Sequence, residues 1–499
     1  MMTRPPTNNL SLPAAAAAYG PRPVGGALPA ASIPISTILT NKNGELTLPI
    51  PGNPFTHAIS LSLLFVFLFL AYSRILDYTF SSLHLPLIVS TLTLCFALFS
   101  GGLFRIFRSL TGILMLLFLG WMTVCVPFAF WKGGSVMYLE DYSKSFLVLM
   151  LLVASLSRTR HVMLACYSIA FAMIGVILLC FTIGSTDETS RLTLVTGLLG
   201  NSNDLAQVLL VGIPFWILFG NARKGMFMRS FVAGTVILVM LYLIMKTGSR
   251  AVMLGVMTAT VMYFLSVSFL NKLKLATAGA VGVAVLMLSG QGALQQRYAT
   301  LFSSENSNSM VTASALASTS QRTELFKRSV ALTLRHPLFG VGPGNFKPAS
   351  VAEFGNEQGT AWYDTHNTMT QISSEVGIPG LVLFCAALLS CFHTVWKLSR
   401  WKAPAGQPIS PVVADHIHFI NRMGSCLLLS LTSLTLTSLF SSIAYHIFFP
   451  TLIGLCAALQ MATKEEFKIL FPPATQSPQP AEAAFTAPPN TAGRLRPAL

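Results

Sequence analysis

The sequence predicts an all-α polytopic membrane protein of about twelve transmembrane helices, with one large periplasmic loop that contains short helices. Of the 499 residues, 53% are hydrophobic and 10% are charged, whereas an ordinary soluble chain carries about 25% charged residues. Apolar runs long enough to cross ~30 Å of hydrocarbon as helices recur along most of the chain. Lys and Arg also alternate between the two sides of these runs. These observations exclude a soluble globular enzyme.

Both ends of the chain are predicted to be disordered cytoplasmic tails. Residues 1–54 are rich in Pro and Ala, and prolines break every short apolar run, which argues against a signal peptide. Residues 463–499 show the same composition from Phe471 onward. Between the tails we expect helices one to nine in 55–290, a periplasmic loop with the catalytic segment in 291–376, and helices ten to twelve in 377–462. The predicted spans are 57–73, 85–100, 109–131, 145–157, 162–184, 205–220, 230–245, 251–270, 273–289, 377–396, 423–443 and 446–462.

The distribution of positive charge sets the predicted orientation. With both tails in the cytoplasm, the short cytoplasmic loops contain more Lys and Arg than the short outer loops, including Arg105, Arg158 and Lys272. This topology explains the formal net charge of +15 better than a nucleic-acid partner does, because no basic cluster carries interleaved aromatic residues. The expected partner is therefore the lipid bilayer and not nucleic acid.

The long loop is the largest predicted extramembrane segment and the expected place of the chemistry. Its residues 303–320 are rich in Ser, Asn and Thr and are predicted to be flexible. An apolar stripe predicts a helix over 322–335, which Pro337 ends. A tight glycine-rich turn over 340–345 follows, and then a polar segment around Asp364, His366 and Asn367 leads into the tenth helix.

Two arginines lie at outer helix boundaries instead of in the basic cytoplasmic loops. Arg191 precedes Asn201 and Asn203, which open the sixth helix, and Arg250 lies in the short turn after the seventh. A guanidinium group binds phosphate through paired hydrogen bonds and keeps its charge, so the two arginines could clamp a lipid-linked diphosphate. The alternative is that both side chains simply reach the lipid headgroups.

His366 is the candidate base, because a histidine near its usual pKa of ~6.5 can accept a hydroxyl proton. The neighbouring Asp364 or Asn367 could orient the ring, and the alternative is a surface histidine without a role. We interpret His336 as a cap of the preceding helix. We interpret His393 and His446 as packing or interface residues.

Motifs for metal or nucleotide binding are missing from the sequence. It contains no Asp-x-Asp pair, no Gly-x-x-x-x-Gly-Lys-Ser/Thr loop and no His-Glu-x-x-His. We therefore expect a metal-independent reaction without a cofactor, in which arginines balance the charge that a metal would otherwise balance.

An ordered set of motifs between about residues 190 and 385 resembles the signature of the bacterial O-antigen ligase and polymerase superfamily. The set comprises 200–206 (GNSNDLA), 247–251 (TGSRA), 336–346 (HPLFGVGPGNF), His366–Asn367 and 375–380 (EVGIPG). The resemblance implies a glycosyltransferase of the bacterial inner membrane whose active site faces the periplasm. Such an enzyme moves a glycan from undecaprenyl diphosphate to the hydroxyl of an acceptor.

The resemblance also implies roles for particular residues. By motif position, Arg191 and Arg250 would hold the diphosphate, and His366 would activate the acceptor; these three are the predicted catalytic residues. Arg322 is a further candidate for the anion site. The predicted substrate-binding residues are Arg322, Asn201, Asn203 and Asn367. The acceptor stays open among lipid A-core sugar, a growing polysaccharide and a protein hydroxyl, as does the choice between ligase and polymerase.

The main alternative function is a transporter or flippase of polysaccharide or lipid-linked precursors. Such proteins usually show two similar halves and charges at mid-membrane. Here no half-to-half repeat is visible, and the clear charges lie at helix ends. A scaffold protein of the envelope, the third alternative, would not need arginines and a histidine grouped on one face.

Overall fold

A computed structural model describes residues 54–187, 191–194, 197–221, 225–267, 269, 272–273, 310–355, 362–404 and 409–471. These residues form helices and one antiparallel hairpin of two short strands. The first half contains α1 (Pro54–Ser73), α2 (Ile75–Phe80), η2 (Ser81–Leu83), α3 (Leu85–Phe99), η3 (Gly102–Arg108), α4 (Leu110–Cys125), η4 (Val126–Phe128), α5 (Lys132–Ser155), α6 (Thr159–Thr182), β1 (Gly184–Thr186) and β2 (Leu192–Leu194). The second contains η5 (Gly197–Gly200), α7 (Ser202–Gly220), α8 (Met226–Lys246), α9 (Arg250–Ser266), α12 (Met310–Arg335), α13 (Phe346–Phe354), α14 (Thr368–Ser399), α15 (Pro411–Ser438) and α16 (Phe448–Leu470).

The structure confirms a predominantly helical membrane protein. Seven helices in the described part of the chain are long and apolar enough to cross a membrane: α1, α4 with η4, α6, α7, α8, α14 and α15. The pair α3 and η3 passes the same test but is bent by 80°, as in a broken span or a re-entrant loop. The described residues therefore provide seven or eight spans, and the predicted number of twelve is not confirmed. The predicted span 273–289 lies outside the described residues.

Two predicted spans belong to longer helices that carry charges. The span predicted at 145–157 is the end of α5, which begins at Lys132 and includes Glu140 and Asp141. The last predicted span is α16, which continues to Leu470, so residues 463–470 of the predicted disordered tail are helical. The reason is tertiary: Glu466 is buried and accepts a hydrogen bond of 2.9 Å from the backbone N–H of Thr159.

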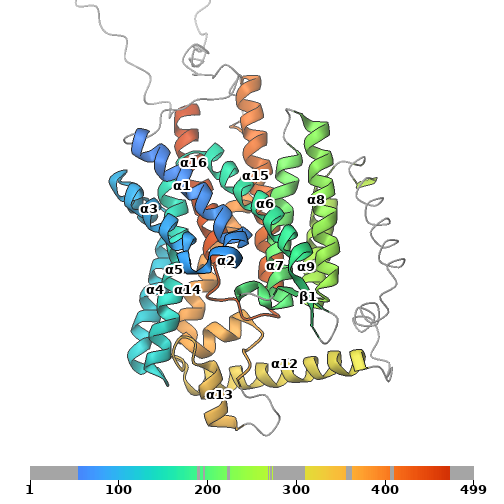
Figure 1. Ribbon diagram of the computed structural model, residues 1–499. Helices are drawn as coiled ribbons and strands as arrows, with labels where there is room; N and C mark the ends of the chain where they lie inside the picture. Colours follow the sequence, from blue (N-terminus) through green and yellow to red (C-terminus); the bar gives the residue numbers. More distant parts are fainter. Residues whose placement is uncertain are drawn as a thin grey trace, which may run out of the picture.

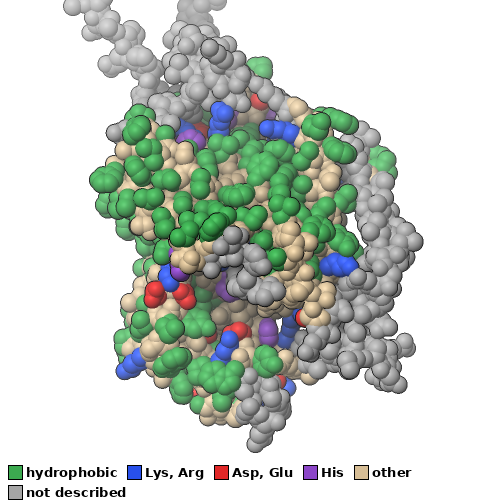
Figure 2. Space-filling model, in the orientation of Figure 1, with side chains coloured by type: hydrophobic (Ala, Val, Ile, Leu, Met, Phe, Trp, Pro, Cys, Tyr) green, Lys and Arg blue, Asp and Glu red, His purple; other side chains and the backbone are tan. Residues whose placement is uncertain are grey.

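The helices form a bundle that α12 crosses at one end (Figure 1). The helix α13 and the start of α14 lie at this same end, which we call the site end. A band of hydrophobic side chains covers the molecule between Lys and Arg side chains near its upper end and charged side chains that begin at about mid-height and continue toward the site end (Figure 2). This pattern is the one expected of a helix bundle whose middle contacts hydrocarbon.

The segment before the glycine-rich turn is more helical than the sequence predicts. The expected helix over 322–335 exists, but it begins at Met310, so part of the segment predicted to be flexible is helical. A small apolar core attaches α12 to the glycine-rich turn and α13; it consists of Leu325, Leu332, Val341, Phe346 and Ala349. This core packs the later part of α12, and the helix extends from there toward Met310.

The glycine-rich turn is tied to a break in α14. The backbone N–H of Gly342 donates to the carbonyl oxygen of Glu375 (2.8 Å), and one Glu375 carboxylate oxygen accepts from the N–H of Gly344 (2.9 Å). Gly377 has φ +73° inside α14, and a Cβ there would lie 2.1 Å from the carbonyl oxygen of Leu338. Only glycine allows this close approach. Two motifs separated in sequence thus form one rigid support at the site end.

Candidate active site

A cavity of about 430 Å³ lies at the site end, between α9, α12, the start of α14 and the loop after α15. Its lining residues are Arg250, Ala251, Leu254, Thr319, Arg322, Thr323, Phe326, Thr365, His366, Asn367, Leu439 and Phe440. The cavity combines apolar walls with two arginines and one histidine. It therefore brings together Arg250, Arg322, His366 and Asn367, which the sequence predicted separately.

Arg250 reaches the cavity from a turn of three residues between α8 and α9. It is the first residue of α9, and its guanidinium donates to the hydroxyl of Thr319 on α12 (3.1 Å). The N-terminus of a helix presents free N–H groups and the positive end of the helix dipole, both of which favour an anion. The turn thus points one charged side chain and one helix end at the same cavity.

Arg191 supports this turn and is not among the residues that line the cavity. Its Nε donates to the carbonyl oxygen of Thr247 (2.8 Å), and its terminal nitrogen donates to Oδ1 of Asn203 (2.9 Å). The same Oδ1 accepts from the hydroxyl of Ser249 (2.8 Å). Asn201 caps α7 by accepting from the N–H of Asn203 (2.9 Å). The predicted pair of arginines is therefore close in space, but Arg191 contacts the backbone and the support of the turn that carries Arg250.

Arg322 enters the cavity from the surface of α12. Thr319, Arg322, Thr323 and Phe326 occupy positions i, i+3, i+4 and i+7 of α12 and so share one helix face. The opposite side of α12 buries Leu325 in the small apolar core. This amphipathic arrangement explains why Arg322 faces the cavity although it lies about seventy residues beyond Arg250 in sequence.

His366 has an unusual backbone conformation for a residue with a side chain. Its φ is +52°, a left-handed conformation that costs about 1–3 kcal/mol for a residue other than glycine. The hydroxyl of Ser442 holds it there by accepting from the His366 N–H (2.8 Å), and Ser442 also lies 3.0 Å from the Thr365 hydroxyl. Strain that is maintained by neighbouring contacts is typical of functional positions.

Burial, together with the positive charges of Arg322 and Lys347, lowers the pKa of His366 to about 4, although Asp364 acts in the opposite direction. The imidazole is therefore neutral at pH 7 and has a free lone pair.

Asp364 and Asn367, which were expected to orient the His366 ring, form other contacts. Asp364 forms an ion pair with Lys347 (3.0 Å), and the side chain of Asn367 caps α14 by accepting from the N–H of Met369 (2.9 Å).

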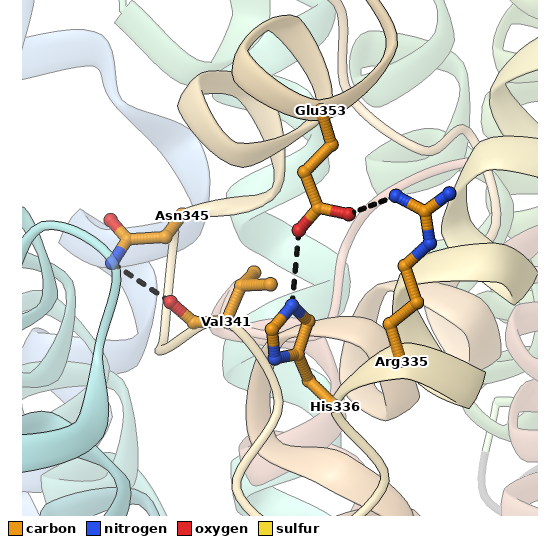
Figure 3. Close-up of polar contacts among 5 residues, drawn as sticks. All are labelled: Arg335, His336, Val341, Asn345 and Glu353. Carbon is orange, nitrogen blue, oxygen red and sulfur yellow. Dashed lines mark hydrogen bonds and ion pairs between the residues drawn. The ribbon is translucent and has the colours of Figure 1, made fainter.

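His336 does not cap α12 with its side chain as predicted. Its Nε2 lies 3.0 Å from one oxygen of Glu353, and the other oxygen of Glu353 accepts from Arg335 (Figure 3). These contacts hold the pKa of Glu353 below its usual value, although its partial burial raises it. The triad joins the end of α12 to α13, and Asn345 closes the intervening turn by donating to the carbonyl oxygen of Val341 (3.2 Å).

The loop between α15 and α16 also contributes to the site, although no sequence pattern predicts this. Leu439 and Phe440 line the cavity, and Ser442 holds His366. The carbonyl oxygen of Ser441 accepts from the Thr368 hydroxyl (2.7 Å). The available signal was a short polar stretch at the outer end of two apolar runs, but such stretches are ordinary in connecting loops.

Within the described ranges, no group of three or more His, Cys, Asp or Glu side chains is arranged to hold a metal ion. The charged groups facing the larger cavity are arginines, which bind and neutralise anions without a metal. The site can therefore hold a phosphate-bearing group beside a neutral histidine.

Fold and site together define a polytopic helical membrane protein with a cationic, partly apolar cavity at one end of its bundle. Residues 235–385 match the family described as O-antigen ligase. This match confirms the resemblance to the O-antigen ligase superfamily of membrane glycosyltransferases, whose members act on glycans, over under a third of the chain. The matched segment includes Arg250, Arg322 and His366, but Arg191 and the loop between α15 and α16 lie outside it. No curated protein matches the sequence.

Proposed function

We propose that the protein transfers a glycan from undecaprenyl diphosphate to an acceptor hydroxyl on the periplasmic side of a bacterial inner membrane, without a metal ion. The observation that carries the proposal is the convergence of Arg250, Arg322 and His366 on one cavity from three separate segments. Such a cavity suits a lipid diphosphate, because the arginines face the anion and the apolar walls face the lipid chain.

In this proposal Arg250 and Arg322 bind the diphosphate and stabilise the negative charge that develops when it leaves. The N-terminus of α9, the positive end of its helix dipole, adds to the same effect. Arg191 acts through the turn that carries Arg250, as the hydrogen bonds to Thr247 and Asn203 indicate. Asn367 orders the start of α14 beside His366.

His366 accepts the proton of the acceptor hydroxyl as the oxygen attacks the anomeric carbon of the donor. The bond to the new oxygen forms, the bond to the diphosphate oxygen breaks, and the diphosphate takes the bonding electron pair. The pKa of about 4 makes the free histidine a weak base. A bound diphosphate adds negative charge beside the imidazole, which favours its protonated form and strengthens the base after the donor binds.

Purified variants separate the two roles. We expect His366→Ala to lower glycan transfer by roughly 10²- to 10⁴-fold with little change in donor binding. We expect Arg250→Ala to weaken donor binding, and Arg250→Lys to restore it poorly because an ammonium lacks the planar pair of donors. His393→Ala, which removes an exposed histidine of α14, is the matched control. Wild-type transfer by His366→Ala would contradict the catalytic role.

A second measurement concerns the metal. Because arginines supply the positive charge of the cavity, transfer from the undecaprenyl-diphosphate-linked glycan should persist in excess EDTA. Loss of transfer on chelation, restored by Mg²⁺ or Mn²⁺, would contradict metal independence.

A further inference from the structure

A second cavity adjoins His366 and has no part in the donor chemistry. It has a volume of about 100 Å³. It is lined by Asn201, Asn203, Asp204, Asp364, His366, Ser441, Ser442 and His446. Among the described residues, His366 is the one that lines both this smaller cavity and the larger one. The imidazole therefore separates two compartments.

The two compartments differ in their ionisable side chains. Among the described residues, the larger cavity is lined by Arg250 and Arg322 and by no carboxyl group. The smaller cavity is lined by the carboxyl groups of Asp204 and Asp364 and, within the same part of the chain, by no Lys or Arg. A diphosphate is therefore attracted to the larger cavity. Lys347 offsets the charge of Asp364 from outside the wall, and the carboxyl group of Asp204 can form hydrogen bonds with a ligand in the smaller cavity.

The smaller cavity also contains a buried polar atom of His446 without a described protein partner. Nδ1 of His446 is buried and has no hydrogen-bond partner within the described part of the chain. Burial lowers the pKa of His446 to about 4, so the ring is neutral and can donate from one nitrogen and accept at the other. An unpaired buried polar group costs about 1–3 kcal/mol, so a ligand that supplies the partner gains that energy.

We infer that the smaller cavity is the acceptor subsite, in which a neutral sugar places hydroxyl groups against Asp204 and His446 and so presents one hydroxyl to His366. The inference rests on the proposed function and adds the residues that choose the acceptor. A carboxylate can accept hydrogen bonds from two neighbouring hydroxyls, and the imidazole can serve a third. The cavity holds only part of a sugar chain, and Asn201 lies exposed at its rim, where the rest of the acceptor would continue.

The arrangement has a catalytic consequence. Donor and acceptor would approach His366 from its two sides, the charged leaving group on the arginine side and the neutral hydroxyl on the carboxylate side. This geometry keeps the acceptor hydroxyl within reach of the base while the arginines hold the diphosphate in the larger cavity.

The test uses the full chain in lipid nanodiscs and two simple probes. Methyl glycosides of glucose, galactose, mannose and N-acetylglucosamine are titrated by saturation-transfer NMR, and inorganic pyrophosphate is titrated by calorimetry. We expect the wild type to bind at least one glycoside. Asp204→Asn and His446→Gln should each raise its Kd about tenfold, the size of one hydrogen bond to a charged or buried group. Both variants should leave pyrophosphate binding unchanged.

Arg322→Ala should show the reverse pattern, with weaker pyrophosphate binding and unchanged glycoside binding. Asp141→Asn removes an exposed carboxylate of α5 that pairs with Lys144, and this control should change neither. Three results would overturn the acceptor subsite: no glycoside bound by the wild type, glycoside binding unchanged in both Asp204→Asn and His446→Gln, or a loss of pyrophosphate binding in these variants. Failure of the proposed function has a separate signature, since the wild type would then transfer no glycan from the lipid donor.

Discussion

The contact between Arg191 and Asn203 allows a sharp test of how the site is held together. Arg191 donates to the Thr247 carbonyl and to Asn203 Oδ1 at 2.8 and 2.9 Å. Each hydrogen bond from a charged group contributes about 1.5–3 kcal/mol. The lysine of Arg191→Lys keeps the charge but reaches only one of the two acceptors. The turn therefore loses one such hydrogen bond and its contribution of about 1.5–3 kcal/mol. Because 1.4 kcal/mol corresponds to a tenfold change in Kd, we expect undecaprenyl phosphate to bind about 10- to 100-fold more weakly.

The matched perturbation removes the acceptor and leaves the charge untouched. Asn203→Ala deletes the oxygen that accepts from both Arg191 and Ser249. If Arg191 acts through the turn that carries Arg250, Asn203→Ala should weaken the binding of undecaprenyl phosphate by a factor similar to that of Arg191→Lys. The double variant should then be less impaired than the sum of the two single variants, with a coupling energy of about 0.5–3 kcal/mol.

The assay is the binding of fluorescent undecaprenyl phosphate to protein in nanodiscs, with thermal unfolding as a check that each variant folds. Arg108→Ala, at an exposed arginine of η3, is the control for loss of positive charge. Additive effects of Arg191→Lys and Asn203→Ala would refute the reasoning and point to direct contact between Arg191 and the diphosphate.

Three further predictions follow from the site end and the topology. Since the pKa of His366 lies at about 4 in the folded chain, kcat/KM should stay level as pH falls from 7 to about 5 and decline only near 4; a decline centred near 6.5 would contradict this value. Gly344→Ala should strongly lower the melting temperature, because φ is +71° and a Cβ would lie 2.1 Å from the aromatic ring of Tyr138, whereas Gly234→Ala on α8 meets open space and should not; equal melting temperatures would argue against the strain. Alkaline phosphatase fused after Ser320 should be active and fused after Lys402 inactive, and the reverse would overturn the proposed orientation.

The same His366 titration has a consequence for stability. The pKa of His366 is about 4 in the folded chain and ~6.5 in the unfolded chain, so between these pH values the unfolded chain binds more protons than the folded chain. The contribution of this neutral histidine to stability is therefore complete above pH ~6.5 and is lost as the pH falls toward about 4. Unfolding of the wild type and His366→Ala across this range measures the difference.

The sequence by itself determined the fold class and the chemical types of the site residues. Long apolar runs with few charges leave helices as the way to satisfy the backbone in a membrane, and this information is local. The ordered motifs identified the superfamily, and they singled out Arg250 and His366. The tight turns were also readable, because glycine is the residue that tolerates positive φ without strain.

Only the tertiary structure decided which candidates share a cavity. Arg322 reaches it because a small apolar core fixes the rotation of α12, while Arg191 turns to the backbone of Thr247. The role of Ser442 depends on a contact across 76 positions of the chain, and no local pattern encodes such a contact. The extent of α16 was decided in the same way: the helix continues past the predicted span to Leu470, and its buried Glu466 accepts a hydrogen bond from Thr159, a contact that hydropathy along the chain does not contain.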